Sequence, residues 1–159
     1  MSRPPRVPGF PYTGPYRYFL TFCTRDRTRV FTSREAVGSA LEQIRRTAAA
    51  ERFAIIAYCF MPDHVHLLVE GTHGDSDLRR FAKLAKQRSG AAHAQATGER
   101  LWQEGYYEHV LRVEENTRGV ARYLLENPVR AGLVASPCDY PFLGSELWSL
   151  TEILEYVMR

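Results

Sequence analysis

Apolar residues along the chain alternate between short, nearly continuous runs and stripes of helical period. The runs "YRYFLTFCT" (16–24) and "FAIIAYCF" (53–60) are rich in aromatic and β-branched residues, which favour buried strands. "HVHLLVE" (64–70) predicts a third strand, and "LWQEGYYEHVLRV" (101–113) contains a fourth. Only the breaker "MPD" (61–63) separates the second strand from the third, so this pair is expected to be antiparallel.

Three longer segments repeat their apolar residues every three to four positions and predict amphipathic helices: "REAVGSALEQIRRTAAAER" (34–52), "LRRFAKLAKQRSGAAHAQA" (78–96) and "ENTRGVARYLLEN" (115–127). Small polar residues before or at the start of each segment can cap its free N–H groups, and these are Thr32 or Ser33, Asp75 or Ser76, and Asn116 or Thr117. Pro128 is expected to end the third helix, because its ring clashes with the preceding turn and it lacks an N–H donor.

The predicted elements follow the order β-α-β-β-α-β-α. This order predicts an α+β fold, a ferredoxin-like sandwich in which helices pack on one side of a central antiparallel sheet. A chain of 159 residues has the size of one domain, 1–159, with a sizeable core. Within it, residues 1–15 are interpreted as a basic, proline-rich arm, and residues 136–159 as a C-terminal tail that ends in a short helix, "SLTEILEYV".

The composition, 45% hydrophobic and 25% charged, is typical of a globular protein in water. No apolar run approaches the ~20 residues that a membrane span needs, and the N-terminus lacks the apolar segment of a secretory signal. We therefore expect a cytoplasmic protein without a membrane partner. Cys23, Cys59 and Cys138 lie far apart with no C-x-x-C pair, which predicts reduced and mostly buried thiols.

Charge is distributed unevenly along the chain. Residues 1–34 contain seven arginines and one acid, Asp26, whereas residues 136–159 contain four acids and one arginine. A basic front suits a polyanionic partner, because the guanidinium fork matches phosphate oxygens. A solvated surface in an arginine-rich chain accounts for the same pattern equally well, so charge alone leaves both interpretations open.

His64 and His66 are the first candidates for chemistry. Side chains alternate along a strand, so both imidazoles point to one face and could bind a single cation. A His-x-His pair is more often without a special role, and two neutral imidazoles need a third ligand. Asn127 offers an amide oxygen, and Tyr123, one helical turn earlier on the same face, offers a phenol. Each also has an ordinary interpretation, Tyr123 as a packed helix residue and Asn127 as a helix end before proline.

Three motifs extend this pattern beyond the histidine pair. "YCFMPDHVHLLV", "LWQEGYYEHVLR" and "ARYLLENPVRAGLV", in this order and spacing, resemble the IS200-like tyrosine transposases, a family of HUH endonucleases. They resemble most closely the branch of REP-associated tyrosine transposases. The resemblance covers roughly residues 16–135. Together the three motifs are highly specific, unlike His-x-His alone.

The resemblance implies a role for each candidate residue. His64 and His66 would hold a divalent metal, Mg²⁺ or Mn²⁺, Asn127 would complete the metal site, and Tyr123 would be the catalytic nucleophile. The insertion-sequence enzymes commonly have glutamine at the position of Asn127, so the shorter amide leaves open whether a water bridges it to the metal. The implied chemistry is cleavage of single-stranded DNA through a 5′-phosphotyrosine intermediate with a free 3′-OH, followed by strand transfer.

The partner implied by the resemblance is single-stranded or hairpin (REP-like) DNA, bound by a nucleoid-associated monomer or homodimer. Candidates for phosphate contacts are Arg25, Arg27 and Arg29 after the first strand, and Arg79, Arg80, Lys83 and Lys86 of the second helix. Candidates for base stacking are Trp102, Tyr106 and Tyr107, for which core packing is at least as well supported. Asp63 could orient an imidazole, but closing the turn after Pro62 is the favoured role, and His109 is left out of the ligand set.

Two other functions fit the same residues. The sheet and its basic surface could form a hairpin nucleic-acid-binding module in which cleavage is lost or secondary. Alternatively, a metal-dependent hydrolase could use water as the nucleophile, with Tyr123 only packing.

Overall fold

A five-stranded antiparallel sheet forms the centre of the protein. The structure is a computed structural model and describes residues 7–112 and 116–159. The strand order is β4-β1-β3-β2-β5, so that β1 and β3 lie inside the sheet. The strands are β1 (Arg17–Cys23), β2 (Phe53–Met61), β3 (His64–Gly71), β4 (Tyr107–Leu111) and β5 (Leu143–Gly144). The antiparallel pairing of β2 with β3, predicted from the short breaker between them, is confirmed.

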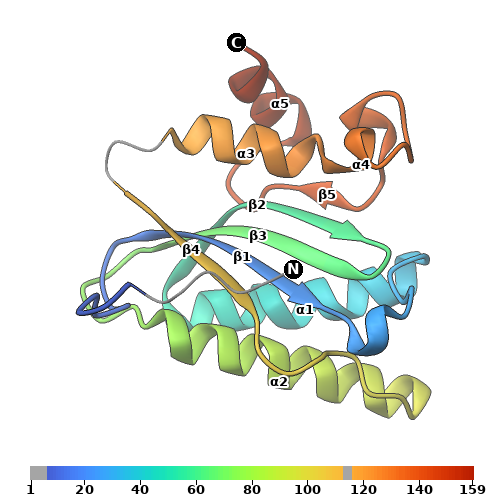
Figure 1. The fold of residues 1–159 in the computed structure, drawn as a ribbon, viewed down its shortest axis with the longest axis horizontal. Helices are drawn as coiled ribbons and strands as arrows, with labels where there is room; N and C mark the ends of the chain where they lie inside the picture. The colour runs from blue at the N-terminus through green and yellow to red at the C-terminus, as the bar shows by residue number, and fades with distance from the viewer. Residues whose placement is uncertain (1–6, 113–115) are drawn as a thin grey trace.

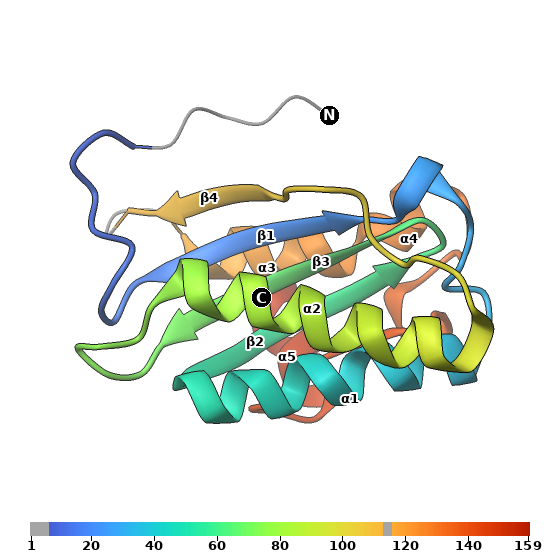
Figure 2. The same cartoon turned by 90° about the horizontal axis from the view of Figure 1, so that it is seen from below.

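Two long helices, α1 (Arg34–Glu51) and α2 (Leu78–Thr97), lie side by side against one face of the sheet (Figures 1 and 2). A fully buried cluster that includes Leu20, Ile44, Leu67 and Phe81 fills the space between them and the sheet. The predicted α+β fold with a central antiparallel sheet is therefore confirmed, and α1 and α2 form the helical layer on this side of it.

The caps of these helices follow the sequence only in part. Ser33 caps α1 and accepts a hydrogen bond from the Ala36 N–H, as predicted. The cap of α2 is Asp77, whose side chain accepts from the Arg80 N–H, and not Asp75 or Ser76. The buried Ser76 hydroxyl instead donates to the Arg52 carbonyl at 2.7 Å, so it is already used to close the loop.

The C-terminal third of the chain adds a layer on the opposite face of the sheet, which the sequence pattern does not predict. This layer contains α3 (Thr117–Leu125), α4 (Asn127–Arg130) and α5 (Leu150–Met158) (Figure 1). Ala121, Leu124 and Leu125 of α3 are buried in a second apolar cluster, together with residues of β2 and α5. The first residues of the predicted third helix, and the end of the predicted fourth strand, lie outside the described residues.

Pro128 redirects the chain without ending its helical conformation. As expected, α3 stops before the proline, at Leu125. A second helical turn, α4, begins at once with Asn127, and Pro128 lies in its first turn, where a missing N–H costs nothing. The break between α3 and α4 therefore lies between the two residues of interest, Tyr123 and Asn127.

The tail is anchored to the edge of the sheet. Leu143 and Gly144 pair with β2, and the Tyr140 hydroxyl donates to the Phe60 carbonyl at 2.5 Å. A side chain at position 144 would meet the Tyr58 hydroxyl at 2.8 Å, so this close approach requires glycine. The predicted final helix is α5, and it begins with a capping box between Ser149 and Glu152.

The alternation of side chains along β3 separates the apolar core from the candidate site. Val65 and Leu67 lie in the core under α1 and α2. His64 and His66 instead line a pocket with residues of α3, and their Nε2 atoms approach each other, so the prediction that they share a face is confirmed. Within the described part of the chain, no helix is both long and apolar enough to cross a membrane.

Truncation of the core beneath the site tests this arrangement. Leu67 is 0% exposed on the central strand, so Leu67→Ala is expected to lower the free energy of unfolding by about 2–5 kcal/mol, through lost burial and the cavity left behind. Urea unfolding followed by circular dichroism measures the change. Leu133→Ala, at a residue 42% exposed, is the matched control and should change stability by less than about 0.5 kcal/mol. Equal losses in the two variants would contradict the assigned core.

Candidate active site

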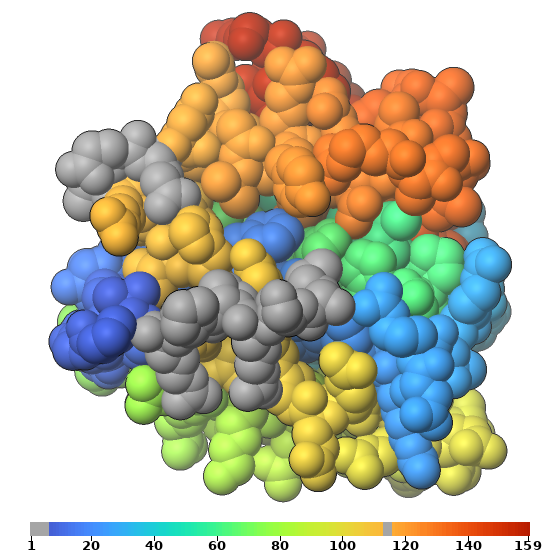
Figure 3. Space-filling model, in the orientation of Figure 1, coloured from blue at the N-terminus to red at the C-terminus, as the bar shows by residue number. Residues whose placement is uncertain are grey.

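The candidate site is a pocket of about 830 Å³ between the sheet and α3. Figure 3 shows this hollow, with α3 on one side, β4 on the other, and atoms of β1 and β3 at its floor. Strands β1, β3 and β4 and helices α3 and α4 supply its walls, and the lining residues are Phe19, His64, His66, Tyr107, His109, Asn116, Gly119, Val120, Tyr123 and Asn127. The pocket thus brings His64, His66, Tyr123 and Asn127 together in one chain.

The two imidazoles meet at their Nε2 atoms, which lie 3.2 Å apart. Burial, together with the nearby His64, Arg130 and Arg27, lowers the pKa of His66 to about 3. Burial also lowers the pKa of His64 below its ordinary value, although the adjacent Asp63 opposes this effect. Both rings are therefore neutral at neutral pH, which is the state in which an imidazole nitrogen can donate a lone pair to a metal.

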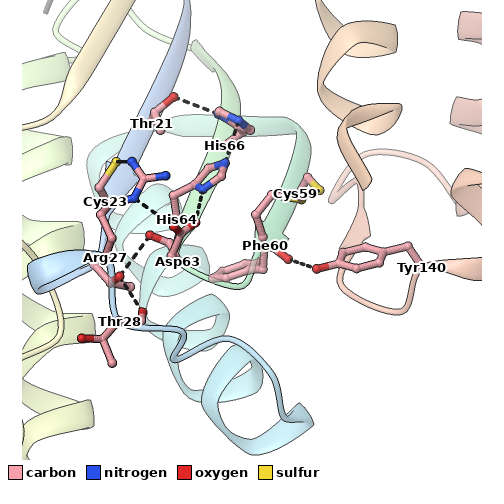
Figure 4. Close-up of polar contacts among 12 residues, drawn as sticks. Thr21, Cys23, Arg27, Thr28, Cys59, Phe60, Asp63, His64, His66 and Tyr140 are labelled. Atoms are coloured by element: carbon pink, nitrogen blue, oxygen red, sulfur yellow. Dashed lines mark hydrogen bonds and ion pairs between the residues drawn. The ribbon is translucent and has the colours of Figure 1, made fainter. Parts of the chain in front are cut away.

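Hydrogen bonds at the other ring nitrogens fix the orientation of both imidazoles (Figure 4). The His64 Nδ1 lies 2.7 Å from the Asp63 Oδ1. Because a carboxylate only accepts, His64 is protonated at Nδ1 and presents the lone pair of Nε2 to the pocket. The His66 Nδ1 lies 2.8 Å from the Thr21 hydroxyl, which can accept or donate and so serves either tautomer of this ring.

The spacing of the imidazoles suits a shared cation. Two ligand atoms each about 2.1 Å from an ion, and at right angles around it, lie about 3.0 Å apart, close to the observed Nε2 separation. Among residues 7–112 and 116–159, no group of three or more His, Cys, Asp or Glu side chains could hold a metal. The half-buried Asn127 lines the same pocket as the imidazoles and offers an amide oxygen.

Asp63 links Arg27 to His64. Asp63 was expected mainly to close the turn, and its carbonyl does accept from the Thr24 N–H, but its carboxylate also holds His64. The Arg27 Nε donates to the other carboxylate oxygen at 3.0 Å. Burial alone would raise the pKa of Asp63, but the hydrogen bonds from Arg27 and His64 outweigh it and hold the pKa below its ordinary value. Arg27, a predicted DNA contact, is thus engaged within the protein.

Tyr123 is the phenol best placed to react. Its side chain is 56% exposed, lines the pocket, and packs edge-on against the Phe19 ring, which in turn stacks on His66. Of the two competing phenols, Tyr107 lines the pocket, whereas Tyr106 packs against Phe22 on the opposite face of the sheet.

The predicted DNA-binding residues are divided between two faces of the protein. Arg25 and Arg29 are exposed beside β1. Helix α2 lies on the far side of the sheet from the pocket, so Arg79, Arg80, Lys83 and Lys86 do not reach the imidazoles. Three of these four have contacts within the protein: Arg79 lies over the Tyr12 ring, Arg80 pairs with Glu51 at 2.8 Å, and Lys86 donates to the carbonyls of Gln103 and Gly105.

Trp102 is a core residue, which corrects its prediction as a base-stacking platform. Its side chain is only 5% exposed, and its indole N–H donates to the Ser89 hydroxyl at 2.9 Å. Its ring packs against Phe22 and Phe31, so neither face is available to a base. The equally supported alternative for this residue, core packing, is therefore the observed one.

Several site residues were not predicted. Thr21 reaches His66 only because β1 and β3 pair with these two residues opposite each other, a register that no local pattern reveals. His109, which was set aside, lines the pocket through strand alternation with Tyr107. Asn116 was predicted as a helix cap and stands at that position, but its side chain makes no capping hydrogen bond and lines the pocket instead.

Comparison with known proteins identifies the family. The sequence profile described as "Transposase IS200 like" matches residues 14–127, most of the chain. This protein belongs to the IS200-like transposase family. The family predicted from the three motifs is thereby confirmed, and the match includes both histidines of the pocket, Tyr123 and Asn127.

Individual proteins similar to this transposase are also named as transposases. The REP-associated tyrosine transposase of Escherichia coli is 27% identical over 128 residues, covering 79% of this chain and 73% of its own. The ISDra2 transposase TnpA of Deinococcus radiodurans is 32% identical over 125 residues, covering 73% of this chain and 86% of its own. A solved structure of a REP-associated tyrosine transposase bound to a REP hairpin has a TM-score of 0.73 at 26% identity, covering 90% of this chain and 82% of that one.

The hydrogen bonds at the Nδ1 atoms of His64 and His66 lead to a prediction for metal binding. Thr21→Val and Asp63→Asn are each expected to weaken Mn²⁺ binding about 10- to 100-fold, because each loosens the orientation of one ring. Isothermal titration calorimetry measures the affinity without any reaction. Thr32→Val, at an exposed threonine away from the pocket, is the control. Unchanged affinity in both site variants would show that these contacts do not support the ligands.

Proposed function

We propose that this transposase is a metal-dependent endonuclease and strand transferase for single-stranded DNA, with Tyr123 as its nucleophile. The observation that carries the proposal is that an exposed phenol and a pair of neutral, oriented imidazoles line one pocket of a single chain. A buried or distant phenol would favour the hydrolase alternative, in which Tyr123 only packs. Its exposure and its place beside Phe19 and the imidazoles support direct attack.

The residues present fit a divalent cation, Mg²⁺ or Mn²⁺, held by His64, His66 and Asn127. When bound, it would polarise the scissile phosphate and offset the charge that develops there. Imidazole nitrogens favour Mn²⁺ intrinsically, whereas Mg²⁺ prefers oxygen ligands. The buried, hydrogen-bonded rings hold the ligand nitrogens in place before the substrate arrives.

The phenolic oxygen of Tyr123 attacks the phosphorus in line with the leaving group. A bond forms between Oη and phosphorus as the phenol gives up its proton to solvent. The bond from phosphorus to the 3′ oxygen breaks, and that oxygen takes up a proton from solvent and leaves as a 3′-OH. The product is a 5′-phosphotyrosine. Because this phosphodiester retains the energy of the bond that was broken, another 3′-OH can reverse the step and join strands without ATP.

The proposed substrate is hairpin DNA with single-stranded flanks. The structural relative bound to a REP hairpin supports this choice. The basic residues of α2 lie on the face away from the pocket, so a folded duplex could rest on one surface while an unpaired flank enters the other. All proposed catalytic residues belong to one chain, so a monomer carries a complete site, and a homodimer would carry two.

The nucleophile can be tested by a covalent adduct. Wild-type protein incubated with labelled hairpin DNA and Mn²⁺ is expected to form a protein–DNA adduct that survives denaturation, and EDTA should prevent it. Tyr123→Phe removes only the reacting oxygen and should abolish the adduct while leaving DNA binding intact. Tyr107→Phe, at the other phenol of the pocket, is the matched control and should retain the adduct.

The three functions give different results in this assay. An adduct that persists in Tyr123→Phe would exclude Tyr123 as the nucleophile. Cleavage without any adduct, unaffected by Tyr123→Phe, would indicate the hydrolase. Hairpin binding without cleavage under any metal condition would indicate the binding module.

A further inference from the structure

Arg130 lies directly against the proposed nucleophile. Its guanidinium carbon is 3.9 Å from the centre of the Tyr123 ring, and its Nη2 donates to the Tyr123 carbonyl. The two residues are seven positions apart, which in a straight helix would separate them by about 10 Å along the axis. Arg130 lies in α4, beyond the break at Glu126, and its long side chain reaches back to the ring and the carbonyl of Tyr123.

Among the described residues, no carboxylate neutralises the charge of Arg130. Many arginines in the described part of the chain pair with an acid, including Arg17 with Glu70 and Arg122 with Glu126. Arg130 has no carboxylate within salt-bridge distance among the described residues, and its only hydrogen bond there is to the Tyr123 carbonyl. One of its five N–H donors is therefore used, and the rest of the fork is available on an exposed side chain.

Through its contact with Tyr123, the guanidinium lies beside a residue that lines the pocket together with His64 and His66. The Arg130 guanidinium is held against the Tyr123 ring and pairs with no carboxylate among the described residues. It is therefore free to bind an anionic group such as a phosphate.

We propose that Arg130 is a catalytic residue that binds a non-bridging oxygen of the scissile phosphate and holds the Tyr123 ring for in-line attack. The proposal rests on the proposed function and names a further residue of the same site. Negative charge shifts among the phosphate oxygens as the Oη–phosphorus bond forms and the bond to the 3′ oxygen breaks. Arg130 remains protonated throughout and stabilises that charge from the side of the nucleophile, opposite to the imidazole pair.

Arginine suits this role better than lysine would. Its planar fork can keep one N–H on the Tyr123 carbonyl while others reach the phosphate, and its flat guanidinium can stack on the phenol. A lysine would keep the charge but lose the stacking and the planar fork, whose separate N–H groups can reach the carbonyl and the phosphate at once. Arg130→Lys and Arg130→Gln therefore separate the contribution of charge from that of geometry.

The first measurement is the rate of adduct formation in single-turnover reactions with labelled hairpin DNA and saturating Mn²⁺. Arg130→Gln is expected to slow the reaction about 10²- to 10³-fold, the usual effect of removing one donor to a developing anion. Arg130→Lys should recover part of the loss. Arg122→Gln is the matched control, because Arg122 precedes the nucleophile on α3 but pairs with Glu126, and its rate should match wild type.

The second measurement is the salt dependence of DNA binding, made with Tyr123→Phe protein so that the DNA stays intact. Losing one phosphate contact should make the slope of log K against log salt shallower by about 0.7 for single-stranded DNA. Arg130→Gln should show this change, and Arg122→Gln should not. This measurement does not depend on cleavage, so it tests the phosphate contact even if Tyr123 is not the nucleophile.

Three outcomes would overturn the proposal. The first is a wild-type rate in Arg130→Gln. The second is a slow rate in that variant with an unchanged salt slope and no recovery in Arg130→Lys, which would mean that Arg130 only props the tyrosine ring. The third is an equal loss in Arg122→Gln, which would indicate a general effect of charge on α3. Failure of the proposed function is recognised separately, by an adduct that persists in Tyr123→Phe.

Discussion

The pairing of β3 with its two neighbours is the constraint on which the site depends. As an inner strand, β3 is fixed on both edges by β1 and β2, and its apolar residues are buried beneath α1 and α2. A slip of one residue would turn every side chain to the wrong face, so this burial also determines where His64 and His66 point. The apolar core thus holds the imidazoles in position without touching them.

The same region of the sheet supplies Thr21 and Asp63, the hydrogen-bond partners of the two imidazoles. Pairing with β1 places Thr21 opposite His66, and the short turn after β2 places Asp63 next to His64. Each ring is therefore held by a different part of the sheet. Buried, neutral rings with one nitrogen already bonded are prepared to act as ligands, at the cost of their solvation.

Helix α3 brings the phenol to this prepared face. Its buried residues, Ala121, Leu124 and Leu125, attach it to the sheet and to α5, and the helical period then leaves Tyr123 exposed toward the pocket. The break at Glu126 allows Asn127 and Arg130 to approach the same region from α4. Rigid packing on one side of α3 and exposure on the other are what a nucleophile on a helix requires.

The sequence by itself determined the first four strands, the long helices and the pair of histidines on one face, because these depend on local periodicity and on turn residues. It also determined the family, through motifs whose spacing is specific. Only the tertiary structure decided that Trp102 is buried, that Asp63 and Thr21 hold the imidazoles, and that α3 covers the face opposite α1 and α2. Those facts depend on strand register and on packing between segments far apart in the chain, and local patterns carry no information about either.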